Sequence, residues 1–155
     1  MIFSRLLADV VWPALLLEQR MLSVVPIVSG LIVEWLALWL GGFGLTWKKA
    51  ALVDVVMNAA SALIGIFLIP LLGMGWEYFP AQIIEKAFNI GTFSQINWLA
   101  TFVLTVFATT LIEAGVVRWG FRVALGIRRF WILFGANAVS VGIAFVSVML
   151  HPPQM

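Results

Sequence analysis

Long runs of apolar residues, separated by shorter polar stretches, cover most of the chain. A transmembrane helix needs about 20 mainly apolar residues, and four runs reach that length. They lie at residues 21–42, 50–72, 96–120 and 129–150. The pattern therefore predicts an all-α polytopic membrane protein with four transmembrane helices. We expect two tandem hairpins, 21–72 and 96–150, within a single membrane domain that spans residues 1–155.

Two stretches outside the hairpins have mixed polarity. In residues 1–20, charged residues and Pro13 interrupt the apolar ones. Asp9 also argues against a cleaved signal peptide, which needs an uninterrupted apolar core. In residues 73–95, Ile83, Ile84, Ala87 and Phe88 fall on one helical face, as in helices that lie in the plane of the membrane interface. Both stretches are predicted to be interfacial segments, and an irregular loop is the alternative for the second.

Polar residues recur at a fixed spacing inside the apolar runs. Three of them have a counterpart of the same type 79 residues later: Glu34 and Glu113, Asn58 and Asn137, Ser61 and Ser140. This offset predicts an internal duplication in which each half is one hairpin. Because both hairpins enter from the same side, the repeat is parallel. Its pseudo-twofold axis should run along the membrane normal, unlike the in-plane axis of inverted repeats.

The distance between each Glu and its Asn predicts a contact. Residue 46 is midway between Glu34 and Asn58, residue 125 is midway between Glu113 and Asn137, and both midpoints fall in a hairpin connection. Residues equally far from a turn lie level on antiparallel helices, because both helices rise 1.5 Å per residue. We therefore expect each Asn amide to donate to the carboxyl of its own hairpin. The serines share the inward-facing stripe of small and polar residues.

Composition supports a bilayer environment and excludes several functions. The chain is 63% hydrophobic and 10% charged, whereas soluble domains are about 45–50% apolar and about 25% charged. It has no Cys and a single His, His151. Disulfides are excluded, and a metal or haem site built from His is implausible. No catalytic motif is present, and the net charge of +2 is too small to suggest nucleic acid. We expect no enzymatic activity, no cofactor and no metal site.

Basic residues gather on one side of the predicted membrane. The two hairpin connections and their helix ends hold six of them and no acid: Lys48, Lys49, Arg118, Arg122, Arg128 and Arg129. The positive-inside rule places these connections in the cytoplasm. We expect an integral protein of a bacterial inner membrane with both termini on the non-cytoplasmic side. The six residues are interpreted first as topology determinants, and partner docking is the alternative.

The membrane-embedded acids allow two interpretations. An acid inside a membrane is costly and marks a function by default. The alternative is a structural role, in which the two Glu–Asn pairs form a buried hydrogen-bonded contact that fixes the register of each hairpin. Each Glu would then be protonated or paired with a cation. Asp54 has no counterpart, because Leu133 stands 79 residues later. We interpret Asp54 as a helix-start acid paired with Lys48 or Lys49, or alternatively as part of an ion path.

Two functional hypotheses follow. The first is a small non-enzymatic membrane subunit that binds or stabilises partner membrane proteins, or copies of itself, through its helices. The alternative is a compact transporter or channel for protons or cations that uses the pairs Glu34/Asn58 and Glu113/Asn137. Under both hypotheses the predicted partners are the lipid bilayer and other membrane proteins or further copies of this chain.

Overall fold

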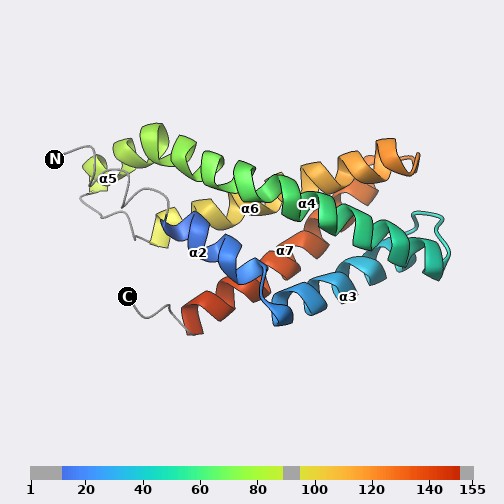
Figure 1. The fold of residues 1–155 in the computed structure, drawn as a ribbon. Helices are drawn as coiled ribbons and strands as arrows, with labels where there is room; N and C mark the ends of the chain where they lie inside the picture. The colour runs from blue at the N-terminus through green and yellow to red at the C-terminus, as the bar shows by residue number, and fades with distance from the viewer. Residues whose placement is uncertain (1–11, 89–94, 151–155) are drawn as a thin grey trace.

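The computed structural model describes residues 12–88 and 95–150, which fold into helices joined by short turns (Figure 1). In chain order these are α2 (Trp12–Met21), α3 (Val24–Leu40), α4 (Trp47–Trp76), the π-helical turn η1 (Glu77–Ala81), α5 (Gln82–Phe88), α6 (Gln95–Gly115), the π-helical turn η2 (Val116–Gly120) and α7 (Ile127–Leu150). Within these residues no strand occurs.

Three helical stretches are long and apolar enough to cross a membrane: Trp47–Ala87, Gln95–Gly120 and Ile127–Leu150. Residues 14–21 of α2 pass the same test together with α3 as one span that is bent by 75°. The predicted all-α class is therefore confirmed, with three candidate spans and the bent pair in the place of the fourth.

Four helices form a ring around the interior of the molecule. α3 packs against α4 and α7, and α6 packs against the same two helices. The turns at 41–46 and 121–126 lie at the same end of the bundle (Figure 1). Arg129, at the start of α7, joins them there, because its Nε donates to the Gly42 carbonyl at 3.0 Å.

The segment before the first hairpin differs from the sequence prediction. Residues 12–21 form α2, which packs against α4, α6 and α7, and its Ala14 and Leu17 are buried. A Cβ added to Gly73 would lie 2.9 Å from the Ala14 Cβ, so this glycine permits the close approach. The predicted first span also begins later, because the chain bends at Leu22 and Ser23 before α3 starts. Residues 1–11 lie outside the described part.

The second helix is much longer than predicted. Instead of ending near Leu72, it continues through η1 and α5 as a 41-residue helical stretch, about 60 Å long at 1.5 Å per residue. Pro80 removes a backbone donor, and the π-helical turn around it accommodates the change without breaking the helix. Residues 82–88 therefore extend α4, and Asn97 of α6 holds this extension by accepting from Trp76 and donating to Glu85.

Two apolar clusters fill the interior and leave a gap between them. The cluster near the turns includes Leu38, Val53, Met57 and Leu133. The other, towards the opposite end, joins Leu17 of α2 to residues of α6 and α7. Polar side chains of all four ring helices occupy the level between these clusters.

Candidate functional site

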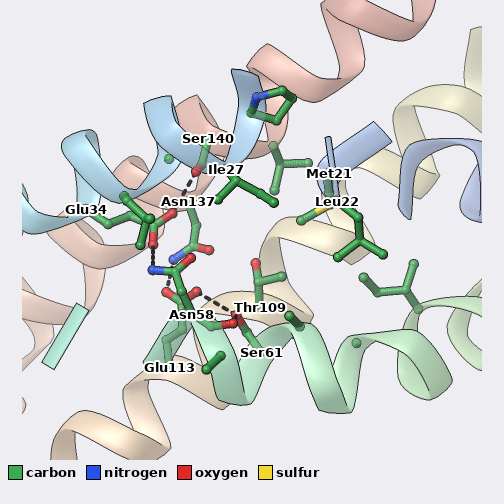
Figure 2. Close-up of a pocket in the computed structure, with 18 of the residues that line it drawn as sticks. Met21, Leu22, Ile27, Glu34, Asn58, Ser61, Thr109, Glu113, Asn137 and Ser140 are labelled. Atoms are coloured by element: carbon green, nitrogen blue, oxygen red, sulfur yellow. Dashed lines mark hydrogen bonds between the residues drawn. The ribbon is translucent and has the colours of Figure 1, made fainter. Parts of the chain in front are cut away.

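The polar level is built around two buried carboxyl groups (Figure 2). Glu34 comes from α3 and Glu113 from α6, and each side chain is only 1% exposed. The Nδ2 of Asn58 donates to Glu34 Oε2 at 2.6 Å, and the Nδ2 of Asn137 donates to Glu113 Oε2. Both hydrogen bonds that the Glu–Asn spacing predicts are therefore present, each within its own hairpin.

The serines connect the hairpins to one another. Ser140 Oγ of α7 donates to Glu34 Oε1 at 2.7 Å, and Ser61 Oγ of α4 lies 3.2 Å from Glu113 Oε1. Each carboxyl thus accepts from the Asn of its own hairpin and from the Ser of the other. The four bonds are therefore equivalent when the two hairpins are exchanged. In both 58–61 and 137–140, the Asn donates within its own hairpin and the Ser donates to the other hairpin. The sequence placed these serines on the inner stripe without indicating that they cross between hairpins.

A small residue makes one of these crossings possible. A Cβ added to Gly30 would lie 2.6 Å from Ser140 Oγ, so a side chain there would displace this hydroxyl from its position at Glu34. Gly30 lies one turn before Glu34 on the same helix face. The hydrogen bond from Ser140 to Glu34 therefore depends on a missing side chain next to the carboxyl.

Asp54 belongs to the same network, and the predicted pairing with lysine is wrong. Its side chain is 2% exposed, and its Oδ1 lies 3.1 Å from Asn58 Nδ2. Lys48 and Lys49 are exposed at the first turn of α4, and Lys48 Nζ instead lies 5.5 Å from the centre of the Trp47 ring. The reason is helical geometry, since Asp54 lies two turns inside α4 on the face that carries Asn58.

A cavity of about 290 Å³ lies beside the network, between α3 and α4. Glu34, Glu113 and the two Asn–Ser pairs line one side, and Met21 and Leu22 lie at the other (Figure 2). Most of the remaining lining is apolar. Six of its lining residues are also exposed on the outer surface: Leu22, Ile27, Val55, Ala59, Ala62 and Ile66. The cavity therefore opens sideways, between two helices of the first hairpin, and the spacing rules used on the sequence could not reveal it.

The six basic residues lie away from the carboxyls. Lys48, Lys49, Arg118, Arg122 and Arg128 are exposed at the end of the bundle that carries the turns. Arg129 also has a structural contact, because its guanidinium donates to Gly42 and Ala124 and lies 5.9 Å from the Phe43 ring. All four side chains that donate to Glu34 and Glu113 are neutral. The topology and docking roles of the basic residues stay predictions.

No protein-family model matches this chain, and comparison with curated proteins and with solved structures finds no match either. Within residues 12–88 and 95–150, no three Asp, Glu, His or Cys side chains form a group that could hold a metal ion. Functional inference therefore rests on the carboxyl network and the cavity beside it.

Proposed function

We propose that the protein crosses the membrane four times, with the bent α2–α3 unit as the first span. In this proposal the hairpins α3–α4 and α6–α7 form a parallel internal repeat, and the pseudo-twofold axis that relates them runs along the membrane normal. The ring of helices and the exchange of hydrogen bonds between hairpins support it. Cys introduced at Thr46 or Leu125 should resist impermeant thiol reagents outside intact cells, whereas Cys at Met155 should react. The opposite labelling pattern would show that the protein has the reverse orientation in the membrane.

We further propose that the carboxyl network is the ion site of a small proton- or cation-coupled transporter or channel. The observation that carries this proposal is the convergence of three buried acids on one network, with Asn58 donating to both Glu34 and Asp54. An ionised side chain costs about 2.5–3.5 kcal/mol near the centre of a membrane on insertion scales. A network that only fixed helix register could use Gln at lower cost, so the repeated choice of Glu favours an ionisable function.

The geometry provides a way for one carboxyl to act on the contact between hairpins. Ser61 Oγ lies 3.1 Å from the Asn58 carbonyl and 3.2 Å from Glu113 Oε1, and its single hydroxyl proton can serve only one of them well. When Glu113 is ionised, the hydroxyl donates to it across the hairpins. When Glu113 is protonated, its O–H donates to Ser61, and the serine proton turns to the Asn58 carbonyl. Uptake of one proton therefore reverses the hydrogen bond that joins the hairpins.

Flux measurements in liposomes test this function. The variant Glu34→Gln with Glu113→Gln keeps side-chain shape and removes ionisation. One acceptor oxygen of each carboxyl becomes an amide group, which can donate to the neighbouring serine as a protonated Glu would. We expect it to insert and fold normally, while proton- or cation-dependent flux falls to the level of empty liposomes. Lys86→Gln, at an exposed position of α5, is the control and should retain full flux. Full flux in the double variant would contradict an ion site at these residues.

The accessory-subunit function is a second candidate, and one observation favours it. All four carboxyl oxygens of Glu34 and Glu113 already accept a hydrogen bond from within the chain. The network is therefore complete as a register-fixing contact, worth about 0.6–2 kcal/mol per bond in a membrane. This function predicts that the double Gln variant retains a stoichiometric partner during purification in mild detergent, and that the native protein shows no flux.

A further inference from the structure

We propose that the cavity between α3 and α4 binds a protonated amphiphilic amine that reaches it sideways from the bilayer. The ammonium group would lie at Glu34 and Glu113, and the apolar body would lie between the two helices. This inference rests on the proposed ion site and names the class of cation that the site takes. The cavity, with its size, lining and opening, carries the argument, and the acids supply charge complementarity.

The size of the cavity separates an organic cation from a bare ion. About 290 Å³ is room for about ten water molecules at roughly 30 Å³ each, and it lies at the lower limit of about 300 Å³ for small-molecule sites. A proton or a single inorganic ion would leave most of this space empty. A compact organic molecule would fill it.

The lining defines a ligand with one polar end. Apolar side chains, among them Ile27, Leu31 and Val55, form most of the wall, and polar side chains gather on the side of the two carboxyls (Figure 2). Water gains few partners along such a wall, whereas an alkyl or aryl group gains about 25 cal/mol for each Å² of apolar surface that it covers. A lipid acyl chain would suit the wall, but it brings no positive charge to the acids.

The hydrogen-bonding capacity of the carboxyls favours an amine with N–H groups. Each carboxylate oxygen has two lone pairs, and each of the four oxygens accepts one bond within the chain. One further donor per oxygen can be accepted without breaking the network. A primary ammonium offers three N–H donors to these positions, whereas a quaternary ammonium offers charge and no donor.

The opening determines the route of access. Leu22, Ile27, Val55 and Ile66 line the cavity and are also exposed on the outer surface. In the proposed topology this surface faces the hydrocarbon of the bilayer. An amphiphilic amine that has partitioned into the membrane can therefore reach the carboxyls without crossing the turns.

Equilibrium binding to the full chain in nanodiscs tests the inference, with tritiated 4-phenylbutylamine as the probe. We expect saturable binding that unlabelled 4-phenylbutanol does not displace and that the trimethylammonium analogue displaces at least ten-fold less well than the amine. Glu34→Gln with Glu113→Gln should weaken binding at least ten-fold. Val55→Phe, which narrows the opening, should do the same. Val56→Phe is the matched control, because Val56 is exposed and does not line the cavity, and it should bind like the native protein.

Several results would overturn the amine site. Displacement by the alcohol as effectively as by the amine would show partitioning without charge recognition, and unchanged binding in Val55→Phe would place the ligand elsewhere. Absence of saturable binding to the native protein, together with carboxyl-dependent ion flux, would remove this inference and leave the proposed function. Saturable amine binding without any flux would remove the transport function and leave the amine site.

Discussion

In the first hairpin, α3 and α4 leave a cavity beside the carboxyl network, whereas in the second hairpin phenylalanine side chains pack along α6 and α7. Val55 and Ile66 line the cavity, and the residues 79 positions later are Phe134 and Phe145. The Phe134 ring lies 4.9 Å from the Phe107 ring, and the Phe145 ring lies 5.6 Å from that of Phe102. The hydrogen bonds of the two hairpins are thus equivalent, although the side chains next to them leave a cavity in the first hairpin and pack as aromatic pairs in the second.

Two further differences distinguish the first hairpin from the second. Gly30 of the first hairpin corresponds to Thr109 of the second, and the buried acid Asp54 corresponds to the buried Leu133. The hydrogen bonds that join the hairpins are therefore shared by both halves. The opening and the third acid lie on the first hairpin, although Glu113, Asn137 and Ser140 of the second hairpin also line the cavity. This division shows that the residues holding the bundle together can be separated from those that distinguish a ligand site.

The largest loss of stability should come from variants of the Glu–Asn hydrogen bonds that both hairpins share. Asn58→Leu and Asn137→Leu each leave a carboxyl oxygen without its donor, at about 1–3 kcal/mol per unsatisfied group. Both side chains line the cavity, but Asn137 is buried and Asn58 is only half-buried. Asn137→Leu should therefore cost more than Asn58→Leu, because water can replace the lost donor more readily at the half-buried position. The free energy of unfolding in mixed micelles measures both, with Ser29→Ala as the control. Equal losses would show that the cavity offers the first carboxyl no substitute donor.

Exchange of the packing residues should give the next largest effect. Phe134→Val removes part of a half-buried ring and should lower the free energy of unfolding by about 1–2 kcal/mol. Val55→Phe adds a ring where space exists and should change it by about 0.5 kcal/mol or less. The same unfolding measurement compares the two variants. A loss for Val55→Phe as large as that for Phe134→Val would mean that the first hairpin is packed as tightly as the second.

The turns allow a smaller test of the same comparison. Gly42 and Gly44 have φ 78° and 72°, and Arg122 has φ 55°, so the first turn contains two residues in the left-handed region and the second turn contains one. Gly44→Ala should destabilise the protein by about 1 kcal/mol. Arg122→Gly should stabilise it by a few tenths of a kcal/mol, because glycine adopts this conformation without steric cost. Thermal unfolding of the two variants gives the signs, and a loss of stability in Arg122→Gly would show that its side chain holds the turn.

Asp54→Leu should have the smallest effect on stability, because it copies the residue that the second hairpin already tolerates. The variant loses one hydrogen bond to Asn58 and removes one buried acid, so we expect a change within about 0.5 kcal/mol. Ion flux in liposomes should nevertheless fall, if the third acid distinguishes the functional half. Unchanged flux would restrict the ion site to the repeated pairs.

The parts of this arrangement that sequence reasoning could predict depend on regular helix geometry. Equal distances from a turn were enough to pair Glu34 with Asn58 and Glu113 with Asn137, because both helices of a hairpin rise by the same amount per residue. The position of α2 could not be derived in this way, since mixed polarity suits a bundle contact as well as an interface. The length of α4 could not be predicted because the apolar run ends at Leu72 and residues 73–95 have mixed polarity, whereas the helix continues through the π-helical turn that contains Pro80.

The cavity and the role of Asp54 were outside the reach of the same reasoning for another reason. Whether a space remains between α3 and α4 depends on the summed volumes of side chains from four helices, which periodicity does not supply. Distance along the chain favours a pairing of Asp54 with the nearest lysines, but the direction of the helix turns the side chain towards Asn58. The one available signal was the four-residue step from Asp54 to Asn58, which places both on one face.

The bond between Ser140 and Glu34 also sets an order of events during synthesis. The two residues are 106 positions apart, and a ribosome adding about 5–20 residues per second needs roughly 5–20 s to cover that distance. Throughout this interval the newly inserted first hairpin holds Glu34 with Asn58 as its only network donor, since α7 does not yet exist. In the proposed topology, the nascent protein therefore carries an acid with only one of its two network donors until its last helix arrives, and protonation would lower the cost of keeping this acid in the bilayer.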